Sequence, residues 1–320
     1  MSINFTTHTY SKFQKSKVIK QLSLAIVEGD VQTANFWTAE LICSGLCVEW
    51  WNVIIESFAK SIHTANVKIT TYLAIRHRHF LARLAEESQT STNLLWVCND
   101  KALIQTIAEI TTIVTTSRKS PSCVKLSVPR SDLSPEQMQA RFSAPSCEFA
   151  VDVIEDDDPV ELFVPLNELA YTLTIDIQSA VYWFEWLLLY EHICKTNGEK
   201  LVCHSRIELG VPSKYSKDVV WSVWAVILAE SKRSCTSVIT RLIEDCLKLY
   251  LIDFSPTTMR SRRFLVYFAI KLIRQASSII ISMDVPLFED KQIIDLMSET
   301  APQLYLQIKS NQLTTTAQKI

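Results

Sequence analysis

Apolar residues recur three and four positions apart through long stretches of the chain, and only four glycines and ten prolines interrupt them. This spacing is typical of amphipathic α-helices. In the N-terminal part we predict helices over residues 8–28, 31–45, 48–62, 66–87 and 94–114. In the C-terminal part we predict helices over residues 176–195, 218–230, 235–252, 257–281 and 288–308. The sequence therefore predicts a mainly α protein.

Capping residues support several of these helix ends. Asp30 and Asp176 are good N-caps, and Ser255 followed by Pro256 is a typical helix start. Gly45 suits the end of the second helix. Since only a few residues separate the second helix from the third, we expect these two helices to form an antiparallel αα-hairpin.

Two short patterns occur twice in the same order. Residues 33–42 and 179–188 share a small polar residue, Ala, an aromatic residue and Trp, followed by apolar positions. Residues 76–81 and 260–265 share an arginine-rich start followed by Phe and Leu. Repetition of two patterns predicts an internal duplication, with two related helical bundles.

The composition changes in the middle of the chain, where proline, serine and acidic residues dominate. We therefore divide the chain into an N-terminal helical bundle at 1–114, a linker at 115–165, and a C-terminal bundle at 166–320 that carries an insertion at 199–216. Apolar and polar residues alternate at 124–128 and at 148–153. This alternation predicts a small β-hairpin within an otherwise irregular linker.

The overall composition is that of a globular chain with no strong bias of charge. Of its 320 residues, 48% are hydrophobic and 21% are charged, and the formal net charge is -2. Nine cysteines without a disulfide-framework spacing indicate free thiols in a reducing compartment. Residues 1–20 lack the apolar centre of a signal peptide, and the apolar run at 219–229 is too short to span a membrane. We expect an intracellular protein that is not secreted and has no membrane span.

Seven tryptophans stand within the predicted helices. They are Trp37, Trp50, Trp51, Trp183, Trp186, Trp221 and Trp224. Exposed rings beside a basic groove would stack on nucleic-acid bases. These rings recur at helical spacing among aliphatic residues, which favours packing in the core.

Basic residues form a stripe on the helix predicted from residue 257. Arg260, Arg263, Lys271 and Arg274 are separated by helical turns, and no acidic residue occurs between residues 255 and 283. Such a stripe could bind phosphates or an acidic partner surface. The alternative is a solvated face, or a contact with the acidic run at 155–158 of the linker.

One group of residues resembles a metal site. It consists of His192, Cys194, Cys203 and His204. Zinc needs four such donors in a tetrahedron, but this spacing matches no standard zinc finger. We therefore predict neither a metal nor another cofactor.

Catalytic motifs are absent from the sequence. It contains no glycine-rich phosphate loop, no His-Glu-x-x-His motif and no nucleophile elbow. Glu40 and Glu185 lie in the repeated patterns, and we predict that they pair with Arg76 and Arg260 rather than act as catalytic acids. The sequence thus favours a protein that is not an enzyme.

The repeated patterns also carry a family resemblance. Residues 36–45, residues 180–186, and residues 254–256 followed by 262–270 resemble an uncharacterised helical protein family of the nucleocytoplasmic large DNA viruses, the giant viruses. The resemblance implies a viral context, with the protein in the host cytoplasm, the viral factory or the virion and other viral proteins as its partners. The family supplies no catalytic or ligand-binding residues that could be carried over.

Two functions follow as expectations. The first is a structural or protein-interaction role, such as a minor virion component or an assembly scaffold. The alternative is a nucleic-acid-binding accessory factor in viral replication or transcription, which would use the basic stripe. The oligomeric state stays open.

Overall fold

The computed structural model describes residues 5–87, 94–120, 126–282 and 286–317. The protein is mainly α, which confirms the predicted fold class. Within the described residues no strand forms, and the only β-pairing is an isolated bridge between His8 and Gln14. No described helix is long and apolar enough to cross a membrane.

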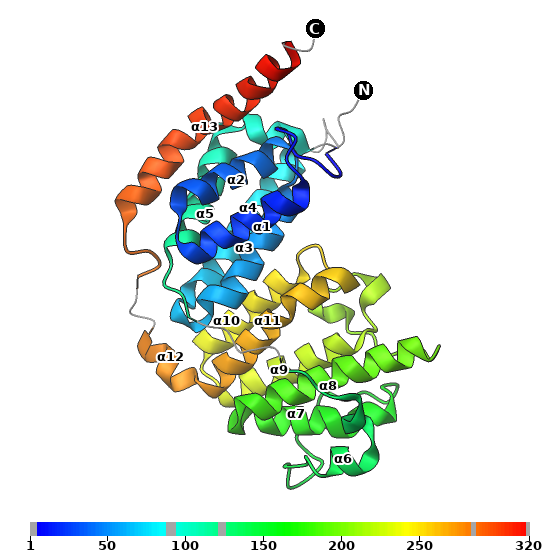
Figure 1. Cartoon of the computed structure of the whole chain (residues 1–320). Coiled ribbons are helices and arrows are strands. Elements are labelled where there is room, and N and C mark those ends of the chain that lie inside the picture. The colour runs from blue at the N-terminus through cyan, green and yellow to red at the C-terminus, as the bar shows by residue number, and fades with distance from the viewer. Residues whose placement is uncertain (1–4, 88–93, 121–125, 283–285, 318–320) are drawn as a thin grey trace. The chain divides into compact units, whose positions relative to one another are not determined.

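The chain divides into two compact units (Figure 1). Unit 1 consists of residues 1–121 together with 283–320, and unit 2 consists of residues 122–282. The division corrects the sequence-based boundaries, which assigned 166–320 to one bundle and 115–165 to a linker. Unit 1 is therefore discontinuous in sequence, and most of the predicted linker is part of unit 2.

Unit 1 is a bundle of helices with short connecting turns. Its helices are α1 (Lys15–Glu28), α2 (Val31–Cys43), α3 (Cys47–Ser57), α4 (Lys68–Glu87), α5 (Lys101–Thr116) and α13 (Lys291–Ala317). A π-helical turn, Phe58–Ile62, follows α3, and a 3-10 segment, η3 (Leu94–Asn99), precedes α5. The predicted helices at 48–62 and 94–114 are thus each divided between α-helix and another helical form.

The ends of α2 follow the predicted capping. Asp30 accepts a hydrogen bond from the backbone N–H of Thr33 at 3.0 Å. Gly45 has φ of 70°, and a Cβ at this position would lie 3.3 Å from the side chain of Leu95. Glycine therefore permits both the left-handed turn and the close approach of η3, and the short α2–α3 connection is confirmed.

The core of unit 1 contains a polar network among α2, α3 and α5. The Asn35 amide donates to the Thr112 hydroxyl at 3.0 Å, and the hydroxyls of Thr38 and Thr111 lie 3.2 Å apart. The Trp50 indole N–H donates to Thr111 at 3.2 Å. Because each of these buried groups has a partner, the threonine-rich end of α5 is accommodated inside the bundle.

Helix α13 belongs to unit 1 because it packs on α2 and α5. Ala301, Tyr305 and Ile308 of α13 are buried. The Lys309 ammonium donates to the carbonyl of Cys98 at 3.0 Å and to the Asn99 side chain at 2.9 Å. These contacts fasten the last helix to η3, which lies about two hundred residues earlier in the sequence.

Unit 2 contains the remaining helices. They are α6 (Pro135–Gln139), α7 (Phe163–Ile175), α8 (Ile177–Thr196), α9 (Val219–Ser234), α10 (Ser237–Leu251), α11 (Pro256–Arg274) and α12 (Ala276–Ser282). Helix α7 packs on α8, α9 and α11. No helix was predicted at the position of α7, although Leu166, Leu169 and Leu173 are buried at helical spacing.

The segment before α7 packs against this helix rather than forming a free linker. Glu168 accepts hydrogen bonds from the backbone N–H of Ser143 at 2.9 Å and of Ala144 at 3.1 Å. The Asn167 side chain accepts from the N–H of Phe149 at 2.9 Å. The predicted β-hairpin is not confirmed, because residues 126–128 form no strand and residues 149–153 form turns, while Val124 lies outside the described residues.

The tryptophan rings lie where the core interpretation placed them, with one exception. Trp50, Trp51, Trp183, Trp186, Trp221 and Trp224 are buried. Trp37 is half-buried and packs edge-on against Phe13 and Phe36. The two tryptophans of the repeated pattern, Trp37 and Trp183, therefore differ in burial, and the internal duplication stays a prediction.

Candidate functional site

The candidate site of unit 2 is formed mainly by α8 and α11. A hydrogen-bonded N-cap side chain marks the start of each helix. The Asp176 carboxylate accepts from the N–H of Ser179 at 2.7 Å at the start of α8. The Ser255 hydroxyl accepts from the N–H of Thr258 at 3.2 Å at the start of α11, and the Thr258 hydroxyl accepts from the Ser255 N–H at 2.8 Å. The reciprocal bonds between Ser255 and Thr258 form a capping box at the start of α11, whereas Asp176 alone caps α8. These starts determine which side chains of each helix face the site.

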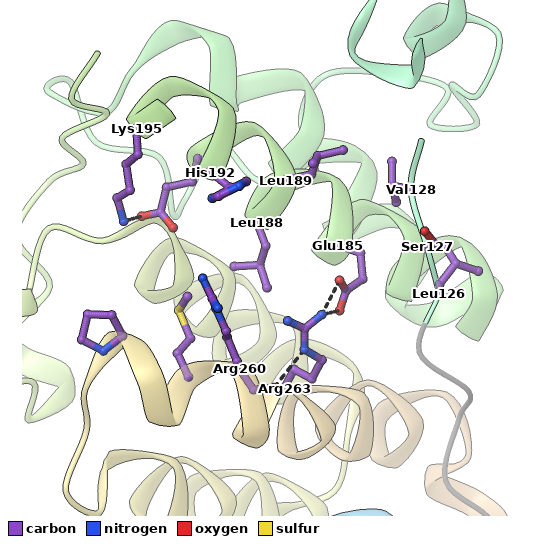
Figure 2. Close-up of a pocket in the computed structure, with 13 residues that line it drawn as sticks. Leu126, Ser127, Val128, Glu185, Leu188, Leu189, His192, Lys195, Arg260 and Arg263 are labelled. Carbon is purple, nitrogen blue, oxygen red and sulfur yellow. Dashed lines mark hydrogen bonds and ion pairs between the residues drawn. The ribbon is translucent and has the colours of Figure 1, made fainter. Parts of the chain in front are cut away.

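A cleft of about 510 Å³ opens between α8, the first turns of α11 and the segment 126–128 (Figure 2). Its lining combines apolar and charged side chains. The lining residues are Leu126, Ser127, Val128, Glu185, Leu188, Leu189, Glu191, His192, Lys195, Pro256, Met259, Arg260 and Arg263.

An ion pair lies at one end of this cleft. The Arg263 guanidinium donates to both carboxylate oxygens of Glu185, at 3.0 and 2.7 Å, and the Tyr267 hydroxyl donates to the same carboxylate at 2.6 Å. Burial raises the pKa of Tyr267, and the hydrogen bond to Glu185 raises it further. Glu185 is thus held by a cation and a neutral phenol, in an arrangement that stabilises the α8–α11 contact.

A second ion pair lies at the other end. The Lys195 ammonium lies 3.1 Å from the carboxylate of Glu191, which is almost fully buried. Glu191 also accepts from the backbone N–H of Val219 at 3.4 Å, at the start of α9. Both acidic groups of the cleft therefore already have cationic partners.

Arg260 differs from the other cations of the cleft. Its side chain is exposed and makes no hydrogen bond or ion pair with the residues that the structure describes. Figure 2 shows that it extends from α11 toward α8. Arg260 therefore presents an unneutralised guanidinium beside the apolar wall formed by Leu188 and Met259.

The predicted pairings of the two glutamates need correction. Glu185 pairs with Arg263 and not with Arg260. Glu40 accepts hydrogen bonds from the Ser11 backbone N–H at 2.7 Å and from its hydroxyl at 2.8 Å, while Arg76 pairs with Glu109. For Glu185 the reason is register, because Arg260 and Arg263 lie one helical turn apart and only Arg263 pairs with the carboxylate. The buried carboxylate of Glu40 instead accepts from the neutral donors of Ser11.

The predicted basic stripe does not converge on one site. Arg260 and Arg263 line the cleft, whereas the Arg274 guanidinium donates to the carbonyl of Ile175 at 3.1 Å, at the end of α7. Lys271 is half-buried and lines neither this cleft nor the smaller hollow beside Arg274. The fully buried Arg262 was not considered in the stripe, and it donates to the carbonyls of Tyr250 and Ile252 at the end of α10.

The four residues considered as metal ligands lie in different environments. His192 is exposed in the cleft, and Cys194 is buried. Cys203 is also buried, and this burial raises the pKa of its thiol to about 12. His204 Nδ1 lies 2.6 Å from Asp157. Among the described residues no group of three or more potential ligands is arranged to hold a metal ion.

Sequence reasoning missed a buried ion pair nearby in unit 2. The Arg206 guanidinium donates to both oxygens of Asp158, at 3.1 and 2.6 Å, and to the carbonyl of Val153 at 3.1 Å. The two side chains are 2% and 1% exposed, so the pair is fully inside the protein. The acidic run at 155–158 is therefore bound by the insertion at 199–216 and not by the basic stripe. The signal available in the sequence was the basic pair His204 and Arg206 within that insertion.

Comparison with protein-family models, curated proteins and solved structures found no match. The resemblance to a family of large DNA viruses stays a prediction.

Proposed function

We propose that the protein is a non-enzymatic interaction component, and that the α8–α11 cleft of unit 2 binds an acidic, partly apolar segment of a partner protein. Under the resemblance to the large DNA virus family, such a role would be that of a minor virion component or an assembly scaffold. The observation that carries the proposal is the exposed Arg260, which has no described partner and stands beside an apolar wall.

Charge complementarity favours a carboxylate as the group that Arg260 binds. Glu185 and Glu191 are already paired with Arg263 and Lys195, so the arginine supplies the uncompensated charge of the cleft. A guanidinium offers several N–H donors that match the two oxygens of a carboxylate. Leu188, Leu189 and Met259 provide apolar contact for neighbouring side chains of the same segment.

The alternative function, binding of nucleic acid, is supported by the absence of acidic residues along α11. Continuous binding to a phosphate backbone needs several free cations in a row. Arg263 and Arg274 are engaged by Glu185 and by the Ile175 carbonyl, so they contribute less to such a row. The cleft thus suits a single carboxylate better than a series of phosphates.

A peptide selection tests the proposal and does not require the partner to be identified first. The intact chain is screened against a random library of displayed 12-residue peptides, and the selected peptides are then measured by fluorescence anisotropy. We expect enrichment of peptides that combine Asp or Glu with Leu, Ile or Phe. Arg260→Glu is expected to weaken their binding at least about tenfold, because a charge-assisted hydrogen bond contributes roughly 1.5–3 kcal/mol. Arg241→Glu, an exposed arginine on α10 outside the cleft, is the matched control.

Two outcomes would overturn the proposal. One is a set of selected peptides without acidic residues, or acidic peptides whose affinity is the same for Arg260→Glu and for Arg241→Glu. The other is tight binding of labelled single-stranded or duplex DNA that weakens steeply with salt and is lost on combined alanine substitution of Arg260, Arg263, Lys271 and Arg274. The second outcome would establish the alternative function.

A further inference from the structure

The segment at residues 126–129 has a strand-like sequence but belongs to no strand. Leu126 and Val128 alternate with Ser127, a pattern that favours β-structure. Pro129 has extended backbone, with φ of -72° and ψ of 150°. A residue that precedes proline is disfavoured in the α region, so Val128 is also directed to extended backbone. The segment therefore favours the local conformation of a strand.

The backbone of this segment carries unpaired hydrogen-bonding groups. Ser127 and Val128 make no hydrogen bond, through backbone or side chain, with any residue that the structure describes. Ser127 is exposed and Val128 is half-buried, so the segment lies at the surface of unit 2. Unpaired N–H and C=O groups along an extended segment are a template for pairing with another strand.

Contacts that follow the segment hold it beside α8. The Pro129 carbonyl accepts from the N–H of Asp132 at 3.0 Å, within the 3-10 turn η4 (Arg130–Leu133) and its start. The Tyr182 hydroxyl donates to the Asp132 carboxylate at 3.0 Å, and the Trp186 indole N–H donates to the Asp132 carbonyl at 2.9 Å. Both aromatic residues belong to α8. The extended backbone is therefore positioned before a partner binds, which lowers the entropic cost of pairing.

The segment borders two hollows of unit 2. Ser127 lines both the α8–α11 cleft and a second hollow of about 390 Å³, and Val128 lines the cleft. Figure 2 shows both residues along one edge of the cleft. In the second hollow Arg141 pairs with the buried Asp132 at 3.3 Å, whereas Arg260 in the cleft has no described partner. Charge complementarity therefore favours an acidic partner on the cleft side of the segment.

We propose that the acidic partner segment binds the α8–α11 cleft as an extended strand that pairs with the backbone at residues 127–128. The inference rests on the proposed function and specifies how the partner is bound. Neighbouring strands lie about 4.8 Å apart, so a strand paired on that side occupies the cleft. Its alternate side chains face α8 and α11, where a carboxylate binds Arg260 and an apolar side chain contacts Leu188 or Met259.

This mode of binding predicts a spacing within the partner. In a strand, residues i and i+2 point to the same face, whereas on a helix residues i and i+3 or i+4 share a face. Peptides selected on the intact chain should therefore carry an apolar residue two positions away from the acidic residue. A spacing of three or four positions would indicate a helical ligand and would contradict the proposal.

An N-methyl scan of one selected 12-residue peptide tests the pairing on the unaltered protein. Each backbone N–H is methylated in turn, and the affinity is measured by fluorescence anisotropy. Successive residues of a strand direct their N–H groups to opposite edges. We therefore expect methylation to weaken binding at least about tenfold at central positions that are never adjacent to each other. The proposal is overturned if every position tolerates methylation or if adjacent positions are equally sensitive.

Proline variants test the same contact from the side of the protein. Ser127→Pro and Val128→Pro each remove one backbone N–H, and proline suits extended backbone. Because these two N–H groups point to opposite edges, we expect one proline variant to bind at least about threefold more weakly than its matched control, Ser127→Ala or Val128→Ala. The other proline variant should bind as its alanine control does. Equal affinity within both matched pairs would overturn the proposal.

The inference and the proposed function can fail separately. If the selected acidic peptides lose affinity on Arg260→Glu but the N-methyl scan and the proline variants show no effect, the partner binds the cleft and only the strand pairing is wrong. If no selected peptide depends on Arg260, the proposed function is wrong and the strand pairing is wrong with it.

Discussion

A buried glutamate in each unit is held in nearly the same way. In unit 1, Glu40 of α2 accepts from the backbone N–H and the hydroxyl of Ser11, at 2.7 and 2.8 Å. In unit 2, Glu168 of α7 accepts from the backbone N–H and the hydroxyl of Ser143, at 2.9 and 3.0 Å. In both cases a serine on a preceding irregular segment supplies two neutral donors to a carboxylate inside a helical bundle.

The two units differ in the partners and the exposure of their other acidic side chains. Unit 2 adds ion pairs of low exposure, Arg206 with Asp158 and Arg263 with Glu185. In unit 1, Arg76 pairs with Glu109 at a site where the two side chains are 30% and 28% exposed. The sequence repeat compares α2 with α8, but the serine–glutamate contact compares α2 with α7. Similar aromatic spacing therefore does not identify residues with the same polar partners.

The largest expected change in stability concerns the buried ion pairs that distinguish unit 2 from unit 1. Arg206→Ala leaves Asp158 buried without its cation, and we expect a loss of about 3–5 kcal/mol in the free energy of unfolding. Lys291→Ala removes an i,i+4 pair with Asp295 on α13 in which both side chains are largely exposed, and we expect a loss of about 0–1 kcal/mol. Urea unfolding of the two variants and the wild type measures both values.

The same pair has a defined pH dependence. Burial by itself would raise the pKa of Asp158, but hydrogen bonds from Arg206 and from two backbone N–H groups bring it below the ordinary carboxyl value. A carboxyl whose pKa is lower in the folded state stabilises the protein above its unfolded pKa, and this contribution is lost as the pH falls through the folded pKa. The wild type should therefore lose stability relative to Arg206→Ala below roughly pH 4. Equal acid sensitivity of the two proteins would contradict this assignment.

The second prediction tests whether the similar serine contacts of Glu40 and Glu168 stabilise the protein. Ser11→Ala and Ser143→Ala each remove a hydroxyl donor and keep the backbone donor, so each should cost about 1–3 kcal/mol of stability. The cost should be larger for Ser11, since Ser143 is the more exposed serine. Ser16→Ala, at an exposed position on α1, serves as the control. A loss no larger than that of the control at both sites would show that the shared geometry has no energetic significance.

The smallest effect concerns the caps of the helices that carry the repeated pattern. Asp176→Ala removes the acceptor for the Ser179 N–H at the start of α8, and we expect a loss of about 1 kcal/mol. Asp176→Asn keeps an oxygen acceptor and should lose less. Asp30 of α2 should show the same order of alanine and asparagine variants, because it caps Thr33 in the same way. Thermal unfolding of the four variants measures the order, and an asparagine variant less stable than its alanine counterpart would contradict the capping role.

Helical periodicity was sufficient to predict the fold class and most helices. Asp30, Asp176 and Ser255 cap helices as their sequence positions indicated. Helix α7 was missed because Pro165 and the neighbouring acidic run made its surroundings resemble a linker, although proline is tolerated in the first turn of a helix. The membership of α13 in unit 1 depends on contacts with residues far away in sequence, which no local pattern encodes.

The candidate site was predictable only in part. Arg260 and Arg263 were identified from their spacing, and both line the cleft. Which of the two is neutralised by Glu185 depends on the rotation and crossing of α8 and α11, and on the phenol of Tyr267 that completes the site.

The split of unit 1 around unit 2 has a consequence for synthesis on the ribosome. Residues 122–282 are translated in full before α13 emerges, so unit 2 is the first unit that can complete its fold. Nascent unit 1 meanwhile exposes the surface of α2 and α5 that α13 later covers. A circular permutant that begins at residue 283 and joins the old termini would reverse this order of events.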